Sequence, residues 1–449
     1  MTTFHEFFRG AKIALDLDSI HSQWKLLTPS YDVNKWRLPL PVWAQRKYEQ
    51  DGLEAWEQLR EELKQGRSTP INIYIHIPFC EGKCGFCDSY SFNLPKRRFE
   101  LISEYCKRLQ NEMGLWSAQG NLSSRPISTI HLGGGTPTLL GEQDLLSLVD
   151  ACRRYFSVSE ATEWALESTV ATLSPRMLTT LHQAGFRRIH LGVQSLEDRV
   201  RQLIGRRCAA TQVVSTIETC LSLGWIVSVD LLCGLPEQTL VGFINGIRTL
   251  ISLGVDGFSI YELLIYPQNQ KWAEKHHLVN RNHLENYWMF LAGANLVEHK
   301  GYKKNLFNHW ALPRAQNIYF TFPVRGEDCL AIGTIADGLF NNYHYRHPRF
   351  ASYMRLIQDE FPGLEGGMRR TPYEESLYPL TISILSGTIS PKCISHLQAT
   401  PRDGGFSLVE RWLLNGLVTG DNQGNLVLTP SGSWFTGNVI ADLILLPVE

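Results

Sequence analysis

The strongest constraint on the fold of this chain is an alternation of strand-like and helix-like segments that occurs six times. Short runs rich in β-branched residues are separated by stretches with apolar residues at helical spacing, such as FELISEYCKRLQNEMGLW and SPRMLTTLHQAG. A strand, a helix and the next strand form a right-handed parallel unit, so the alternation predicts a parallel α/β sheet. The expected strands cover residues 71–77, 128–134, 163–168, 187–193, 226–232 and 257–263.

The residues at the carboxyl ends of these strands are small or polar. In order they are a cysteine-rich loop, GGGTPT (133–138), Glu167, Gln194, Asp230 and the pair Tyr261–Glu262. In a βα barrel the carboxyl ends of the strands meet at one mouth, where catalytic groups collect. We therefore expect these residues to share one pocket.

The chain divides into three predicted regions. Residues 1–69 form an N-terminal helical and aromatic extension, and residues 70–365 form the barrel, in which GEDCLAIGTIADGLF is one more buried segment. Residues 366–449 form a separate C-terminal α+β domain. Within that domain LVTGDNQGNLVLTPSG is typical of a hairpin, and we interpret it as the wing of a winged-helix-like unit.

The cysteine-rich loop, IHIPFCEGKCGFCDSYSF, contains three cysteines in the spacing C-x3-C-x2-C: Cys80, Cys84 and Cys87. A structural zinc site takes four ligands, and no second cysteine pair is in evidence. Iron–sulfur clusters are held by thiolates. Three thiolates on a four-iron cluster leave one iron without a protein sulfur, and such an open position is where a small molecule binds. Gly82 and Gly85 are expected to let the loop bend, and Phe86 to shield the cluster from water.

Composition narrows the class of protein. The 449 residues are 43% hydrophobic and 19% charged, with a formal net charge of -1, so no global field favours nucleic acid or an anionic membrane. The other seven cysteines are scattered singly, which indicates a reducing compartment. The N-terminus has no continuous apolar region, and NVIADLILLPVE is too short to span a bilayer. We expect a soluble, cytoplasmic protein.

The chain has a family resemblance that depends on four motifs. In order, they are YIHIPFC with its two following cysteines, GGGTPT, LGVQS and DLLCGLP. The chain resembles radical S-adenosylmethionine (radical SAM) enzymes, and more narrowly the oxygen-independent coproporphyrinogen III oxidase-like (HemN/HemW-like) group. The resemblance covers most of residues 70–345. It implies a partial parallel (β/α)6 barrel of the radical SAM type.

The resemblance also implies a site. Cys80, Cys84 and Cys87 would bind a [4Fe–4S] cluster whose open iron chelates SAM. The other residues implied at the SAM site are Tyr74, Gly134, Gly135, Thr136, Glu167, Gln194, Arg206 and Asp230. His76 and His131 are interpreted as packed core histidines, whereas His309 is a predicted substrate contact.

The reaction is left open among three branches of this group. True coproporphyrinogen oxidases carry a further cysteine two residues after the third ligand, where this chain has Ser89. We therefore favour a methyltransferase-type member, which implies one or two SAM molecules and a planar substrate with an sp2 carbon that is methylated or cyclopropanated. The aromatic segment HSQWKLLTPSYDVNKWRLPLPVW could cover such a pocket. The alternatives are a coproporphyrinogen oxidase, a haem chaperone and, more distantly, a barrel hydrolase with structural zinc. A low-potential flavodoxin or ferredoxin is implied as electron donor.

Overall fold

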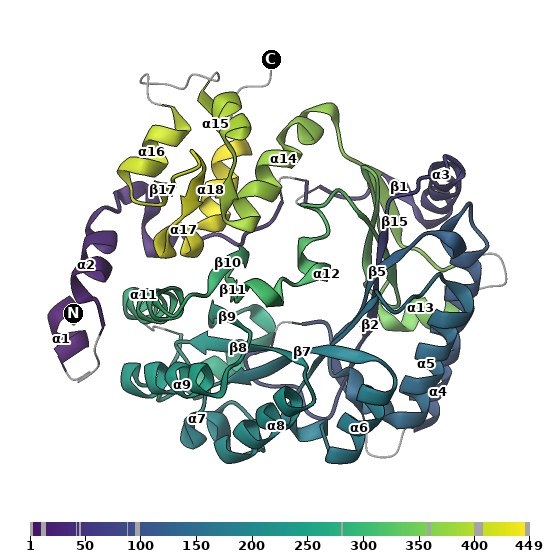
Figure 1. Cartoon of the computed structure of the whole chain (residues 1–449), viewed down its shortest axis with the longest axis horizontal. Helices are drawn as coiled ribbons and strands as arrows, with labels where there is room; N and C mark the ends of the chain where they lie inside the picture. Colours follow the sequence, from purple (N-terminus) through teal and green to yellow (C-terminus); the bar gives the residue numbers. More distant parts are fainter. Residues whose placement is uncertain are drawn as a thin grey trace.

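The computed structural model describes residues 3–9, 15–41, 43–44, 46–87, 89–94, 99–279, 282–356, 361–398 and 407–444. Its centre is a curved 13-stranded sheet with helices on the outer face (Figure 1). The strands of this sheet, in spatial order, are β1 (Gln50–Asp51), β15 (Gly366–Arg369), β14 (Tyr343–Arg346), β13 (Asp337–Phe340), β12 (Asp328–Ile332), β2 (Ile71–Ile77), β5 (Ile127–Gly134), β6 (Glu163–Ser168), β7 (Phe186–Gln194), β8 (Ile226–Cys233), β9 (Gly257–Glu262), β11 (His309–Ala311) and β10 (Lys303–Leu306).

The six predicted strands are confirmed as β2 and β5 to β9, and all of them run parallel. Their predicted bounds agree with the observed ones to within one residue at each end. Strand β2 is buried at all positions except Tyr74, which is typical of a parallel strand covered on both faces. The segment predicted as one more buried run supplies β12, a seventh parallel strand beside β2, and β13. The barrel is therefore partial, and antiparallel strands extend the sheet at both ends.

Helices connect the parallel strands and cover their outer face (Figure 1). Helix α6 shows why they form where they do: Ser174 accepts from the Met177 N–H as N-cap, and Pro175 occupies the first turn. The helices up to the end of the barrel are α1 (Phe4–Arg9), α2 (Leu17–Lys25), α3 (Gly52–Lys64), α4 (Phe99–Ser117), α5 (Gly141–Tyr155), α6 (Pro175–Gln183), α7 (Asp198–Leu203), α8 (Ala210–Ser222), α9 (Leu240–Leu253), α10 (Gln270–Lys275), α11 (His283–His299), α12 (Ile318–Thr321) and α13 (Phe350–Leu356).

The C-terminal part has the order helix, strand, two helices and a two-stranded hairpin, as expected of a winged-helix-like unit. The elements are α14 (Pro372–Ser386), β16 (Thr388–Ile389), α15 (Pro391–Gln398), α16 (Leu408–Leu414), β17 (Val418–Gly420), β18 (Leu426–Leu428), α17 (Pro430–Trp434) and α18 (Thr436–Ile444). Strand β18 pairs antiparallel with both β16 and β17, so the predicted hairpin is confirmed. The large sheet contains strands from all three predicted regions, because β1 lies before residue 70 and β15 lies after residue 365.

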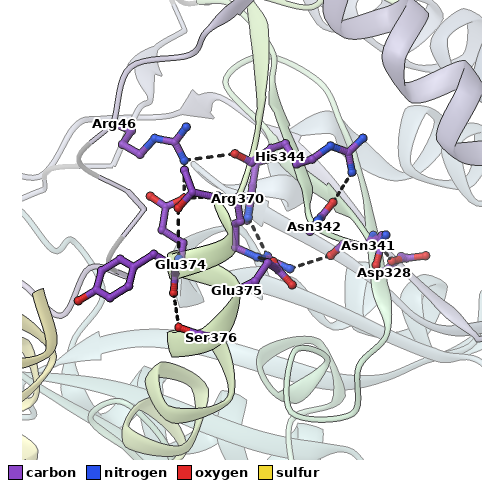
Figure 2. Close-up of polar contacts among 12 residues, drawn as sticks. Arg46, Asp328, Asn341, Asn342, His344, Arg370, Glu374, Glu375 and Ser376 are labelled. Atoms are coloured by element: carbon purple, nitrogen blue, oxygen red, sulfur yellow. Dashed lines mark hydrogen bonds and ion pairs between the residues drawn. The ribbon is translucent and has the colours of Figure 1, made fainter. Parts of the chain in front are cut away.

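A polar network joins the C-terminal part to the sheet (Figure 2). Arg370 is buried just before α14, pairs with Glu375 of that helix and donates to the Asn341 carbonyl at 2.9 Å. Its guanidinium also lies 4.0 Å from the centre of the Tyr378 ring. Arg46, from the N-terminal extension, pairs with Glu374. These contacts hold α14 to the turn between β13 and β14 and to the extension.

The N-terminal extension is also attached to the C-terminal helices. The Trp36 indole N–H donates to the Trp434 carbonyl at 2.8 Å, and the Asn438 amide donates to the Lys35 carbonyl at 2.9 Å. These bonds fix the extension as it passes the barrel mouth. Within the described residues, no helix combines the length and hydropathy needed to cross a membrane.

Candidate active site at the barrel mouth

The cysteine loop leaves the end of β2 and is closed at its base by main-chain pairing. Strand β3 (Phe79–Cys80) pairs with β4 (Phe92–Asn93) in parallel. The Phe92 N–H donates to the Pro78 carbonyl at 2.9 Å, and the Leu94 N–H donates to the Cys80 carbonyl at 3.0 Å. Cys80, Cys84 and Cys87 are free thiols of intermediate exposure, and all three line one cavity of about 770 Å³, which we call the large cavity.

Gly85 is needed in this loop for a different reason from the predicted bend. A Cβ at Gly85 would lie 2.2 Å from the Trp272 ring, so any side chain would displace the tryptophan. Phe86, the next residue, lines the large cavity and lies with its ring centre 5.6 Å from the Arg206 guanidinium. Phe86 also packs against an apolar cluster that includes Leu232 and Leu263, and its role as an apolar cover stays a prediction.

The glycine-rich end of β5 forms the wall opposite the loop. Gly134, Gly135 and Thr136 all line the large cavity, as predicted. Gly134 has φ +106°, and a Cβ there would lie 2.5 Å from the His76 ring, so glycine is required by the packing of the chain itself. The Thr136 N–H donates to the Phe79 carbonyl at 2.7 Å, which ties this wall to the base of the cysteine loop. The Ser89 hydroxyl donates to the Gly134 carbonyl at 3.0 Å.

Glu167 reaches the large cavity from the end of β6 as a carboxylate. It accepts from His131 Nε2 at 3.1 Å and from the Gly134 N–H at 3.1 Å. Burial alone would raise its pKa, but the bond from His131 and that from Gly134 together lower the pKa below its ordinary value. Glu167 thus presents a negative charge that can accept from ligand hydroxyl groups.

Gln194 and Arg206 provide polar atoms without partners. Among the described residues, Gln194 Oε1 and Arg206 Nε are buried and make no hydrogen bond. Both side chains line the large cavity. Gln194 also has φ +64°, an uncommon backbone conformation for a non-glycine residue that occurs where a site imposes it. A polar ligand in the cavity would satisfy these atoms.

Asp230, in the second half of β8, lines both the large cavity and a second one. Burial raises the pKa of Asp230 to about 7, and the nearby charge of Glu167 contributes to this rise. A hydrogen bond from Ser259 and the charge of Arg206 act in the opposite direction. The second cavity, which we call the side cavity, has a volume of about 330 Å³. It shares Phe86, Cys87, Gln194 and Asp230 with the large cavity. Its other lining residues are Trp36, Leu38, Leu232, Tyr261, Glu262, Leu263, Leu264, Tyr266, Phe307 and Asn308.

Two predicted site residues are not brought to either cavity. Tyr74 lies deeper in the barrel, where its ring stacks on Tyr319 and its hydroxyl is 3.0 Å from His76 Nδ1. His309 is buried, and its Nδ1 lies 2.9 Å from the Ser259 hydroxyl. Burial lowers the pKa of His309 to about 3, so the ring is neutral. The predicted packing of His76 and His131 is confirmed, since both are buried.

His190 on β7 is a lining residue that sequence reasoning missed. It faces the large cavity, and its Nε2 lies 2.6 Å from Asn317 Nδ2. Asn317 Oδ1 is occupied as an N-cap acceptor from the Phe320 N–H, so the amide N–H₂ must donate to His190. His190 therefore keeps its proton on Nδ1. Burial, together with the nearby rings of His309 and His131 and the charge of Arg188, holds its pKa well below 6.5. The contact comes from a helix far along the chain, so no local sequence signal could have revealed it.

The donor set of the large cavity fits an iron–sulfur cluster together with a polar ligand. Three free thiols supply soft ligands at one wall, and an unpaired amide oxygen and guanidinium nitrogen lie at the other. A structural zinc site would need a closed ligand group. Among the described residues, no group of three or more His, Cys, Asp or Glu side chains lies close enough together to hold a single metal ion.

Comparison with known proteins agrees with this donor set. Residues 74–250 match the radical SAM superfamily. The heme chaperone HemW of Bacillus subtilis (strain 168) is 36% identical over 199 residues, which are 44% of this chain and 51% of that protein. Residues 74–250 form a radical SAM domain similar to those of the HemN/HemW group.

Further similar proteins include one that is named as an oxidase and a solved structure. The oxygen-independent coproporphyrinogen III oxidase of Bradyrhizobium diazoefficiens is 29% identical over 257 residues, which are 56% of this chain and 55% of that protein. The alignments thus span about half the length of both curated relatives. The solved structure of the Escherichia coli coproporphyrinogen III oxidase, HemN, superposes with a TM-score of 0.75 at 19% identity, covering 91% of this chain and 98% of that one. This structural match confirms the fold.

Proposed function

We propose that this radical SAM protein binds a [4Fe–4S] cluster and SAM in the large cavity and methylates an sp2 carbon of a planar substrate held in the side cavity. The observation that carries the proposal is the wall that the two cavities share. Phe86, Cys87, Gln194 and Asp230 line both, so a substrate in one cavity would lie next to the cofactors in the other.

The cofactors would be held by named residues. Cys80, Cys84 and Cys87 would ligate the cluster, Arg206 would pair with the methionine carboxylate, and Glu167 would accept from ribose hydroxyls. When bound, the cluster supplies the electron that cleaves the SAM sulfonium and so starts the radical chemistry. The volume of the large cavity, about 770 Å³, lies in the upper part of the range of small-molecule sites, and the proposal extends to a second SAM molecule.

The chain's own groups would orient the substrate and move a proton. Phe86 and the aromatic walls of the side cavity would exclude water. Replacing hydrogen by methyl at an sp2 carbon releases a proton. Asp230 could accept it, because its carboxyl borders both cavities and its pKa, raised by burial to about 7, suits a proton acceptor near neutral pH.

The test is the product ratio after anaerobic reconstitution with iron and sulfide and reduction with dithionite in the presence of SAM. Equal formation of S-adenosylhomocysteine and 5′-deoxyadenosine supports methyl transfer. Deoxyadenosine alone, with consumption of coproporphyrinogen, would assign the oxidase reaction instead. Cys84→Ala should abolish cluster binding and both products, whereas Cys393→Ala, a partly exposed cysteine in α15, is the matched control that should retain them.

The relatives favour two other functions, each with its own measurement. The name of the Bacillus subtilis relative suggests haem binding, which absorbance titration with haem would detect as a stoichiometric complex without substrate turnover. The Bradyrhizobium relative and HemN suggest porphyrinogen decarboxylation. Ser89 counts against that reaction, because its hydroxyl donates to Gly134 at the position where the true oxidases carry a further cysteine.

The proposal also includes a low-potential flavodoxin or ferredoxin as electron donor and a reducing, cytoplasmic compartment. All ten cysteines are free thiols in the structure, which supports the choice of compartment. Binding of a reduced flavodoxin that replaces dithionite in the product assay would test the donor.

A further inference from the structure

The side cavity has walls suited to a flat aromatic guest. Its largest lining side chains are Trp36, Phe86, Tyr261, Tyr266 and Phe307. The Tyr261 and Phe307 ring centres are 5.7 Å apart with an interplanar angle of 35°. A volume of about 330 Å³ lies at the lower end of the range of small-molecule sites, so it fits a compact ring system. Aromatic walls stack well with such a ring.

The charges at this cavity have one sign. Among the fourteen lining residues that the structure describes, none is Lys, Arg or His, and the carboxyl groups are those of Asp230 and Glu262. Glu262 is already engaged: its Oε1 accepts from His283 Nδ1 at 2.8 Å and from Asn286 Nδ2 at 3.0 Å. Asp230 is the acidic group at the wall shared with the large cavity.

The nearby basic residues belong to other cavities. Lys35, Arg37 and Arg411 line a separate cavity that also borders Trp36, and there Arg411 pairs with Asp442 at 2.9 Å. Arg206 lines the large cavity only. Among the described residues that line the side cavity, a carboxylate would thus meet carboxyls and rings but no cationic side chain, and burial of an unpaired charge is costly.

We propose that the substrate of the side cavity is a flat aromatic molecule that is uncharged or carries a basic nitrogen, and that bears no carboxylate. This inference rests on the proposed function only in taking the side cavity as the substrate site. A basic nitrogen would pair with Asp230, and an uncharged ring would need only the apolar walls. Porphyrinogens with several carboxylates are excluded as ligands of the side cavity, because their carboxylates would find no cationic partner among its described lining residues.

Three indole derivatives of similar size test the charge preference. Indole-3-acetamide is uncharged, tryptamine is cationic and indole-3-acetate is anionic. Binding is measured by isothermal titration to the full chain, reconstituted anaerobically and saturated with SAM. We expect the acetamide and tryptamine to bind, and the acetate to bind at least about tenfold more weakly, as repulsion by nearby carboxyls in a semi-polar site predicts. Equal binding of the acetate, or no binding of any of the three, would overturn the inference.

A charge placed on the wall provides the second test. Leu264 lines the side cavity and is half-buried, so a longer side chain can be accommodated at the edge. Leu264→Lys should strengthen binding of indole-3-acetate and weaken that of tryptamine, each about tenfold. Leu264→Met is the matched control and should leave the order of the three ligands unchanged. If the lysine variant keeps the wild-type order, the guest does not lie in this cavity.

The same preparations separate this inference from the proposed function. Iron content and SAM cleavage are measured in each one. If the chain binds no cluster and cleaves no SAM, the proposed function fails, whereas the ligand order still reports on the side cavity. If SAM is cleaved but indole-3-acetate binds as tightly as the acetamide, only the substrate inference fails.

Discussion

Asp230→Asn should stabilise the cofactor-free chain at alkaline pH and have a smaller effect at acid pH. Burial raises the pKa of Asp230 from 3.8 to about 7, with the Ser259 hydrogen bond and Arg206 opposing and Glu167 adding to the shift. A carboxyl with a raised folded-state pKa binds its proton more tightly in the folded chain. Its stabilising contribution is therefore fully present below the unfolded-state pKa and is lost as pH rises through the folded-state pKa.

The size of the effect follows from the two pKa values. The full span from 3.8 to about 7 corresponds to about 4 kcal/mol, of which about 3 kcal/mol is lost between pH 5 and pH 8. Because Asp230 borders cavities that water can enter, we expect about 2 to 3 kcal/mol over that interval. Asparagine does not titrate, so the variant lacks this loss.

Urea unfolding at several pH values, under reducing conditions, measures the free energy of unfolding of both chains. The free energy of unfolding of the variant minus that of the wild type should grow with pH. Taking this difference cancels the titration of the groups that both chains share. Asp18→Asn is the matched control, because it makes the same replacement of a carboxylate by an amide at an exposed residue of α2, away from both cavities. A flat difference for Asp230→Asn, or a variant less stable than wild type at pH 8, would refute the reasoning.

Three further substitutions test the strain at the site, a buried ion pair and a helix cap. Gln194→Gly should raise the free energy of unfolding by up to about 1 kcal/mol, because residue 194 has φ +64°, a conformation that glycine adopts easily. The same variant should weaken SAM binding in equilibrium dialysis. The control His277→Gly, at an exposed residue with φ +57°, should stabilise the chain by a similar amount and leave SAM binding unchanged. Arg188→Met should destabilise by about 3 to 5 kcal/mol in urea unfolding, because it leaves Glu163, now 2.9 Å from the guanidinium, without its buried partner. Thr371→Ala should cost about 1 kcal/mol by calorimetry, because it removes the capping box of α14.

The parallel strands could be predicted closely because each combines an apolar run with a polar residue at its carboxyl end. The same rule placed Glu167, Gln194 and Asp230 at one mouth, and the structure brings them together. The antiparallel strands beyond β12 were not predicted. Several have only two to four residues, and their pairing depends on distant segments such as β1 with β15.

The depth of a side chain within the barrel could not be derived from the sequence. Tyr74 and His76 are two positions apart on β2 and so point to the same face, but Tyr74 lies one step further from the mouth. His309 was predicted to be a substrate contact at the mouth. Strand β11 runs antiparallel to β9, so His309 pairs with Ser259 in the middle of β9. Strand direction and depth both depend on contacts between segments far apart in the chain.

The main-chain pairing at the base of the cysteine loop affects whether the protein can recover after oxygen damages its cluster. The bonds from Phe92 to Pro78 and from Leu94 to Cys80 join protein atoms only. Oxygen that strips the inorganic centre would therefore leave the loop's entry and exit in register. Such damage should be repairable by a fresh delivery of iron and sulfide, without the chain having to unfold or be made anew.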